Sequence, residues 1–312
     1  MPSLGISKLA LPPQPYRIDK LLNEFEQESA CTSENDIRSN RLSKYGDPRY
    51  SGGRLYPVPQ ALALAEQLQS LPTGPDDASL ACSVSMRELR KRVLGWSCAL
   101  YDDTAEHAPT TFTVACRQWE VAAEQLRQFD PRKLVKEFLT DINRAGGLER
   151  DGYLIAFLHS ELVNQERYRN HFHGLGSASF INILDKLRSS EKYQSPQGER
   201  PTIQIRRKPI DNVPYTLSYI LKSYWPGMYE GPVGDGSSVA RQSHVRRIRE
   251  PHHSDVLLWM DQWRLEDITL LKNLRVGAGG LGLIPTKLYS HSNTIKPANW
   301  SNLSVPSSDR GF

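Results

Sequence analysis

Two strand-like stretches joined by a short polar loop constrain the fold of this chain most strongly. Residues 153–163 form a long apolar-rich run, and residues 170–177 alternate histidine with apolar side chains. The polar loop at 164–169 is too short for a helical crossover. The two stretches are therefore expected to pair as an antiparallel hairpin at the centre of a sheet.

The two faces of this hairpin differ in chemistry. Side chains alternate along a strand, so His171 and His173 share one face while Phe172 points to the other. On the partner strand, His159 and Glu161 share a face. The reverse face of that strand carries leucines, at Leu154, Leu158 and Leu162. If the leucines pack against helices, the imidazoles and the carboxylate lie together on an open face of the sheet.

Such a group could bind a divalent metal ion. Two imidazoles and a carboxylate suit Mg²⁺ or Mn²⁺, and positions on the ion stay open for phosphate oxygens. Glu161 is the expected third ligand, with His159 as an alternate ligand or as a residue that orients the others. A lone His-x-His pair is usually structural, so the carboxylate on the same face is what favours the metal.

Strands and helices alternate around the hairpin. Asp130 and Pro131 begin a helix that the Gly146-Gly147 pair ends. The other expected elements are a strand at 110–116, a helix at 180–188, a strand at 202–206 and a helix at 213–225. The order β-α-β-β-α-β-α predicts an α+β domain with a ferredoxin-like antiparallel sheet and helices on one face.

The last of these helices carries a candidate nucleophile. With about 100° of rotation per residue, Tyr215, Tyr219 and Lys222 fall on one stripe, and the apolar Leu217 and Leu221 lie on its reverse. Asp211 or Asn212 would cap the helix, with Pro214 in its first turn. A phenol is a weak nucleophile near neutral pH, and a lysine one turn away could stabilise the phenolate or a phosphate. The alternative is an ordinary amphipathic helix with two exposed tyrosines.

The regions outside this domain differ in composition. Before the sheet domain at 108–230, we expect a flexible or loosely docked N-terminal arm at 1–80, which includes a short helix at 59–71, and a basic helical lead-in at 81–107. After it, we expect a helical extension with a candidate DNA contact at 231–286 and a flexible tail at 287–312. Within the extension, Trp259 and Trp263 favour helical packing over base stacking.

Charge and cysteine content narrow the class of protein. The net charge is only +4 among 312 residues, but the basic residues are clustered. The clusters are Arg87, Arg90, Lys91 and Arg92; Arg206, Arg207 and Lys208; and Arg241, Arg246, Arg247 and Arg249 with His244. Three clusters around one candidate site favour a polyanionic partner over a merely solvated surface. We expect no membrane segment and no secretory signal. The four cysteines are expected to be free thiols in a reducing, cytoplasmic setting.

These motifs together resemble the HUH endonucleases, the superfamily of rolling-circle replication initiators. The segment from His171 to Gly174 matches the two-histidine motif, and Tyr219 with Lys222 matches the Tyr-x-x-Lys motif. Tyr215 fits the paired-tyrosine version of that motif. A weaker first motif of the family corresponds to residues 111–115, and the resemblance covers about residues 108–228.

The resemblance implies a mechanism. A metal ion at His171, His173 and Glu161 would polarise a phosphate of single-stranded DNA, and Tyr219 would attack it with help from Lys222. The products would be a 5′-phosphotyrosine and a free 3′-hydroxyl, and Tyr215 could perform a second transfer. The residues expected to contact DNA are Gln204, Arg206, Arg207, Arg246 and Arg247.

The function expected from these features is initiation of rolling-circle replication of a plasmid, phage or integrated element. The sequence contains no Gly-x-x-x-x-Gly-Lys-Ser/Thr motif, so a host helicase would unwind the duplex at the replication origin. Residues 277–282 satisfy Gly-x-Gly-x-x-Gly, but Pro285 follows and no helix pattern begins there. The alternatives are a two-tyrosine transposase with the same chemistry and a DNA-binding regulator that has the fold without the activity.

Overall fold

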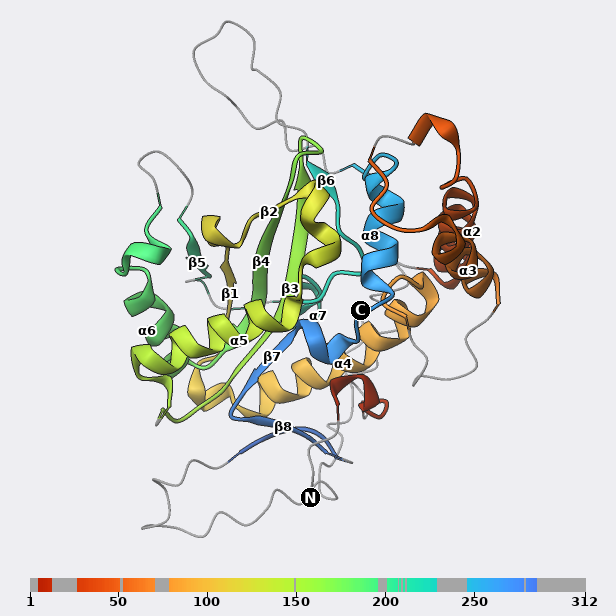
Figure 1. The fold of residues 1–312 in the computed structure, drawn as a ribbon. Coiled ribbons are helices and arrows are strands. Elements are labelled where there is room, and N and C mark those ends of the chain that lie inside the picture. Colours follow the sequence, from red (N-terminus) through yellow and green to blue (C-terminus); the bar gives the residue numbers. More distant parts are fainter. Residues whose placement is uncertain are drawn as a thin grey trace, which may run out of the picture.

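The computed structural model describes residues 5–12, 27–50, 53–70, 79–148, 150–195, 201–206, 208, 210, 212–228, 246–277 and 279–284. The fold is α+β, with a predominantly antiparallel sheet at its centre (Figure 1). The sheet contains β1 (Thr110–Val114), β2 (Val121–Ala122), β3 (Leu154–Val163), β4 (Arg167–Gly176), β5 (Ile203–Ile205), β6 (Gly227–Met228) and β7 (Thr269–Lys272).

The sheet is organised around the β3–β4 hairpin. Its strands follow the order β5-β1-β4-β3, and β7 extends the sheet beyond β3. Since β1 and β3 are both antiparallel to β4, they run parallel to each other with β4 between them. The expected hairpin is confirmed, although its second strand begins at Arg167. Asn164 and Gln165 close the turn with positive φ of 50° and 62°, which asparagine tolerates better than most residues.

One face of the sheet packs against α5 (Pro131–Ile142) and α6 (Ala178–Leu187). Phe172 of β4 stacks on Phe138 of α5, with ring centroids 4.9 Å apart. Asp130 accepts the amide N–H of Arg132 and caps α5, as the sequence predicts. Figure 1 shows α5 crossing the sheet on this side.

The opposite face carries the histidines, and it is covered rather than open. The segment that follows α7 (Val213–Ser218) lies on it, and α4 (Ser83–Asp103) packs behind that segment. His159 and His171 are therefore only 2% and 7% exposed. The expectation of helices on a single face is wrong, because the chain places a second layer over the histidines.

The N-terminal region contributes to the core. α3 (Val58–Gln69) confirms the helix expected at 59–71. The helix α2 (Glu28–Ser43) was not expected, and the segment 27–70 differs from the loosely docked arm predicted for it, because both helices bury side chains. The buried stripe of α2 is largely polar and consists of Cys31, Asn35, Arg38, Ser39 and Leu42. Arg38 and Ser39 donate to the carbonyl oxygens of Ala81 and Ala65, respectively, so the helix has no apolar periodicity to reveal it.

The region after residue 245 also differs from expectation. It begins with α8 (His252–Met260), where Trp259 is buried against Trp225 as packing predicts. The chain then forms β7, β8 (Leu274–Gly277) and β9 (Gly280–Leu283) instead of further helix. The Gly-x-Gly-x-x-Gly stretch is the β8–β9 hairpin. The tail expected at 287–312 lies outside the described residues.

Short 3-10 turns connect the main elements, at Ile6–Lys8, Pro48–Tyr50, Ala105–His107, Arg117–Trp119, Ala123–Gln128, Glu191–Tyr193 and Leu265–Ile268, and a π-turn spans Asn143–Gly147. No helix in the described part of the chain has the length and apolar character required to cross a membrane. All four cysteines are buried free thiols.

Candidate functional site

Three imidazoles lie together on the central hairpin. His159 of β3 pairs directly with His171 of β4, and Phe157 pairs with His173. The ring centroids are 4.7 Å apart for His171 and His173, 5.2 Å for His159 and His173, and 6.0 Å for His159 and His171. We call these three residues the histidine cluster. Their shared face is the one that strand alternation predicts.

His171 and His173 have hydrogen bonds that leave Nε2 available as a ligand. The Nδ1 atom of His171 lies 3.1 Å from the backbone carbonyl oxygen of Arg169, so Nδ1 carries the proton. The Nδ1 atom of His173 lies 2.8 Å from the Thr113 hydroxyl, and its Nε2 is buried without a hydrogen-bond partner. Metal-binding histidines commonly use one ring nitrogen in this way while the other binds the ion.

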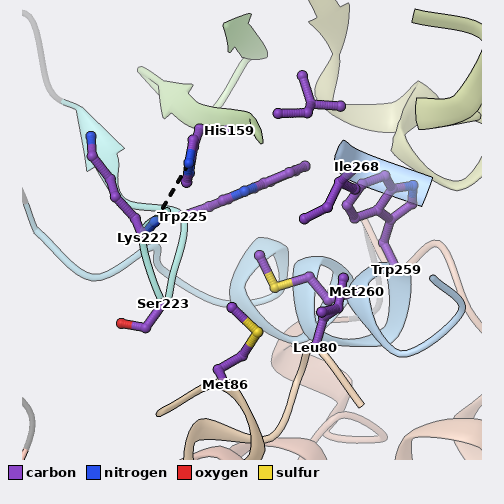
Figure 2. Close-up of a pocket in the computed structure, with 10 residues that line it drawn as sticks. Leu80, Met86, His159, Lys222, Ser223, Trp225, Trp259, Met260 and Ile268 are labelled. Atoms are coloured by element: carbon purple, nitrogen blue, oxygen red, sulfur yellow. Dashed lines mark hydrogen bonds between the residues drawn. The ribbon is translucent and has the colours of Figure 1, made fainter. Parts of the chain in front are cut away.

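His159 instead uses its Nε2 atom in a hydrogen bond to the backbone. Its Nε2 lies 3.0 Å from the carbonyl oxygen of Ile220, and the amide nitrogen of Lys222 lies 3.4 Å from the same Nε2 (Figure 2). A carbonyl oxygen can only accept, so the shorter contact requires a proton on Nε2. The longer contact is then not a true hydrogen bond. His159 therefore fits the role of an orienting residue better than that of a ligand through Nε2.

All three histidines are held neutral. Burial lowers the pKa of His171 to about 4 and the pKa values of His159 and His173 well below 6.5. The ammonium group of Lys222 further lowers each of these pKa values. Burial also lowers the pKa of Lys222, while the Glu161 carboxylate opposes that shift. Neutral imidazoles are the form that binds a metal ion, so at neutral pH protonation does not prevent these rings from acting as ligands.

Glu161, the expected carboxylate ligand, forms an ion pair with Arg169. Glu161 lies opposite Arg169 in the hairpin, and Arg169 Nη1 is 3.0 Å from Glu161 Oε1. Within the described residues, no set of three His, Cys, Asp or Glu side chains is arranged to hold a metal ion. The donor chemistry of His171 and His173 fits two ligands of an ion, whereas Glu161 would have to leave Arg169 to become a third.

The two tyrosines lie together, but on a shorter helix than expected. Asn212 caps α7, and the helix ends at Ser218 instead of near residue 225; Asp211, the alternative cap, is outside the described residues. The hydroxyl oxygens of Tyr215 and Tyr219 are 2.9 Å apart, and both side chains are exposed. The hydrogen bond with Tyr215 is the main cause that raises the pKa of Tyr219.

Side chains from other elements bind the carbonyl groups at and after the end of this helix. Arg90 of α4 donates from Nε to the carbonyl oxygen of Leu221 at 2.6 Å and from Nη2 to that of Ser218 at 3.1 Å. His159 donates to the carbonyl oxygen of Ile220. Lys222 lies beyond the end of α7, so it does not continue the stripe of Tyr215 and Tyr219. The predicted single helical face for all three residues is therefore wrong.

A groove of about 440 Å³ joins the histidine cluster to the tyrosines. His173 lines it from β4, and Tyr215 and Tyr219 line it from α7 and the turn that follows. Its remaining lining residues are Thr111, Phe112, Thr113, Gln204, Ile205, Arg206, Thr216 and Ile220. His173 pairs with Thr113, which in turn pairs with Gln204, so a row of polar side chains crosses three strands at the floor of the groove.

The residues proposed to contact DNA are distributed unevenly. Gln204 and Arg206 are exposed on the groove, while Arg207 lies outside the described residues. Arg246 is exposed and pairs through its backbone with Gly227. Arg247 makes two contacts of 2.6 Å with the carboxylate of Glu34, which reduces its availability for phosphate.

Two of the four residues in the basic cluster expected on α4 are buried. Arg87 and Arg90 are only 5% and 7% exposed. The sequence did not identify Arg90 as a residue that supports the site. Its signal is its spacing: Arg90 lies four residues after Met86 and three before Val93, on the buried stripe of α4. Thr113 was also missed, and only its place in the strand at 110–116 could have indicated it.

A second cavity behind His159 is too small for a substrate. It holds about 20 Å³, the space of a single water molecule, between His159, Met86 and Met260 (Figure 2). The 440 Å³ groove is therefore the better candidate for ligand binding. Comparisons with protein-family models, with curated proteins and with solved structures give no match for this chain.

Proposed function

We propose that this protein nicks and rejoins single-stranded DNA through a phosphotyrosine intermediate, with the chemistry of the HUH endonucleases. One observation carries the proposal: His173, Tyr215 and Tyr219 line the same groove, although they come from different elements of the fold. A strand of DNA in that groove would meet the metal-binding imidazole and both phenols together. Its biological role would be to initiate rolling-circle replication, with a host helicase opening the duplex.

The topology of the sheet supports the finer fold assignment. β1, α5, β3, β4, α6 and β5 occur in this order along the chain, with the two-residue β2 between β1 and α5, and β4 separates the parallel strands β1 and β3. This is the split β-α-β arrangement of ferredoxin-like domains. We propose that this unit is the HUH fold, extended by β7 and covered by α4.

The roles of the residues follow from their positions. His171 and His173 would hold a Mg²⁺ or Mn²⁺ ion through Nε2, and Glu161 would join them after release from Arg169. When bound, such an ion polarises the scissile phosphate and stabilises its developing charge. The Tyr219 oxygen attacks phosphorus, the bond from phosphorus to the 3′-oxygen breaks, and that oxygen leaves as the 3′-hydroxyl. The proton that Tyr219 loses ends on the departing 3′-oxygen, and the Tyr215 hydroxyl hydrogen-bonds the attacking phenol oxygen.

Lys222 and Arg206 contribute charge around this step. The ammonium group of Lys222 lowers the pKa of all three imidazoles, and in the proposed site it would stabilise phosphate negative charge. Arg206 lines the groove and contacts the Thr216 hydroxyl at 3.5 Å, which places its guanidinium at the edge of the tyrosine helix. Both would bind the DNA backbone without reading its sequence.

Covalent attachment tests the proposal directly. The purified protein is incubated with Mn²⁺ and a pool of labelled single-stranded oligonucleotides, and denaturing gels reveal any protein–DNA adduct. We expect an adduct with wild type, its loss with Tyr219→Phe, and its retention with Tyr224→Phe, since Tyr224 is equally exposed but does not line the groove.

The competing functions give different results in the same experiment. A wild-type protein that never forms an adduct but binds the oligonucleotides in gel-shift assays would be a DNA-binding regulator. A preference for paired transposon ends over a replication origin would instead identify a transposase. Adduct formation that survives Tyr219→Phe would contradict the assigned nucleophile.

A further inference from the structure

The backbone that carries Tyr219 is held from two sides by buried side chains. We call residues 218–222 the tyrosine turn. Arg90 bonds the first and fourth carbonyl oxygens of this turn, those of Ser218 and Leu221. His159 bonds the carbonyl oxygen between them, that of Ile220. The turn is thus attached to α4 on one side and to the histidine cluster on the other.

We propose that Arg90 is a positioning residue of the nicking site, which fixes the tyrosine turn so that Tyr219 rather than Tyr215 meets the scissile phosphate. This inference rests on the proposed function. It assigns a role in the site to α4, which lies outside the sheet unit at 108–228 that resembles the HUH endonucleases.

The chemistry of the guanidinium supports this role. The planar fork of arginine can bond two carbonyl oxygens at fixed angles, which a flexible lysine ammonium cannot reproduce. Arg90 is almost fully buried, so these bonds are shielded from competing water. The two carbonyl groups flank Tyr219 in the chain, so their positions limit where its side chain can lie.

Fixing the turn matters because two phenols are available. Tyr215 and Tyr219 share a hydrogen bond and the same groove, so similar nucleophiles compete for one phosphate. Tyr215 belongs to α7, which Asn212 caps independently of Arg90, whereas Tyr219 follows the helix and depends on the turn. Loss of Arg90 would therefore displace Tyr219 more than Tyr215.

The test compares Arg90→Ala and Arg90→Lys with the control Arg87→Ala. Arg87 is on the same helix and equally buried, and it pairs with the adjacent Glu88. With Mn²⁺ and saturating single-stranded DNA, we expect Arg90→Ala to lower the rate of adduct formation at Tyr219 roughly 100-fold. Peptide mapping by mass spectrometry should show a larger share of adduct on Tyr215. Added guanidinium ion should partly restore the Tyr219 adduct in Arg90→Ala and have no such effect in Arg87→Ala.

A second measurement does not depend on activity. Hydrogen exchange at the amides of residues 218–222 should accelerate in Arg90→Ala, less so in Arg90→Lys, and not at all in Arg87→Ala, while β3 and β4 remain protected. Unchanged exchange in a folded Arg90→Ala protein would overturn the proposal even if activity were lost. If the wild-type protein never attaches covalently to single-stranded DNA, the proposed function is refuted. The exchange data would still decide whether Arg90 holds the turn. If Arg90→Ala does not fold, the shift between Tyr219 and Tyr215 in Arg90→Lys decides the question.

Discussion

The Thr113 hydroxyl lies 2.8 Å from Nδ1 of His173, while Nε2 of the same ring is buried without a partner. The two residues are paired across β1 and β4, so the backbone register keeps them together. This contact orients the imidazole with its free nitrogen toward the candidate ion site. Thr113 is therefore expected to tune metal binding without touching the metal.

We predict that Thr113→Val weakens Mn²⁺ binding by roughly tenfold to 100-fold, because valine has the same shape but no hydroxyl to orient His173. Thr113→Ser retains the hydroxyl and should bind Mn²⁺ with nearly wild-type affinity. Titration of the free ion by electron paramagnetic resonance measures both. Equal affinities for the valine and serine variants would show that the hydroxyl has no part in metal binding.

The Tyr215–Tyr219 hydrogen bond leads to a pH-dependent prediction. This bond is the main cause that raises the pKa of Tyr219. In Tyr215→Phe the pKa of Tyr219 should fall toward its ordinary value, so the reactive phenolate forms at lower pH. The pH profile of single-turnover adduct formation should then shift to lower pH. Tyr224→Phe serves as the control, and a profile that stays in place in Tyr215→Phe would contradict the coupling.

The ion pair between Arg169 and Glu161 predicts a gain in metal affinity. Arg169→Met removes a positive charge near the site and frees the Glu161 carboxylate. Both effects favour a cation, and we expect Mn²⁺ to bind roughly tenfold more tightly. Arg167→Met is the matched control, because Arg167 lies on the same strand and pairs with Glu120, which Arg169 also contacts, rather than with Glu161. If adding Glu161→Gln to Arg169→Met leaves the affinity unchanged, Glu161 is not a ligand.

The sequence predicted best those features that depend on local alternation. The faces of β3 and β4 follow from the period of a strand, so His159, Glu161, His171 and His173 were placed on one side before any tertiary contact was known. Phe172, on the opposite face, is fully buried, as that alternation predicts. The placement of the site on the hairpin could therefore be predicted without knowledge of what covers it.

The remaining features depend on tertiary contacts that leave no local pattern. α7 ends at Ser218, and Arg90, more than a hundred residues earlier in the chain, binds carbonyl groups at and beyond its end. The helix α2 buries hydrogen-bonded polar residues such as Arg38, and so lacks an apolar stripe. β7 contains only two apolar residues, Leu270 and Leu271, and so short a pattern does not distinguish a strand from a helix.

Stability should depend on the protonation of His171. Its pKa in the folded protein is lowered from 6.5 to about 4 by burial, so the unfolded chain binds the proton more readily. The stabilisation is therefore fully present above pH 6.5 and is lost as the pH falls toward 4. At about 1.4 kcal/mol per pKa unit, it amounts to about 3 kcal/mol. Urea unfolding in EDTA should show His171→Asn losing less stability than wild type between pH 7 and pH 4. An identical pH dependence would contradict the assigned burial.

Protonation of Asp255 should change the stability of the fold in the opposite direction to protonation of His171, within an overlapping pH range. This carboxylate of α8 is fully buried and hydrogen-bonded by Tyr45, and burial raises its pKa from 3.8 to about 6. The folded protein therefore holds the proton more tightly than the unfolded chain does. Stability from Asp255 is fully present below pH 3.8 and is lost as the pH rises through 6, which again corresponds to about 3 kcal/mol.

Asp255→Asn removes the carboxyl group whose protonation stabilises the fold as the pH falls. The amide oxygen of the variant can still accept the Tyr45 hydroxyl. We predict that the variant is at least as stable as wild type at pH 7.5 and loses stability more steeply on acidification, because the neutral histidines then act without an opposing group. Urea unfolding at half-unit intervals between pH 7.5 and pH 4 measures the slopes. Asp261→Asn should steepen the slope in the same direction, since burial also raises the pKa of Asp261, whose contact is with Ser79. A slope for Asp255→Asn no steeper than that of wild type would show that Asp255 is ionised in the fold at neutral pH without cost.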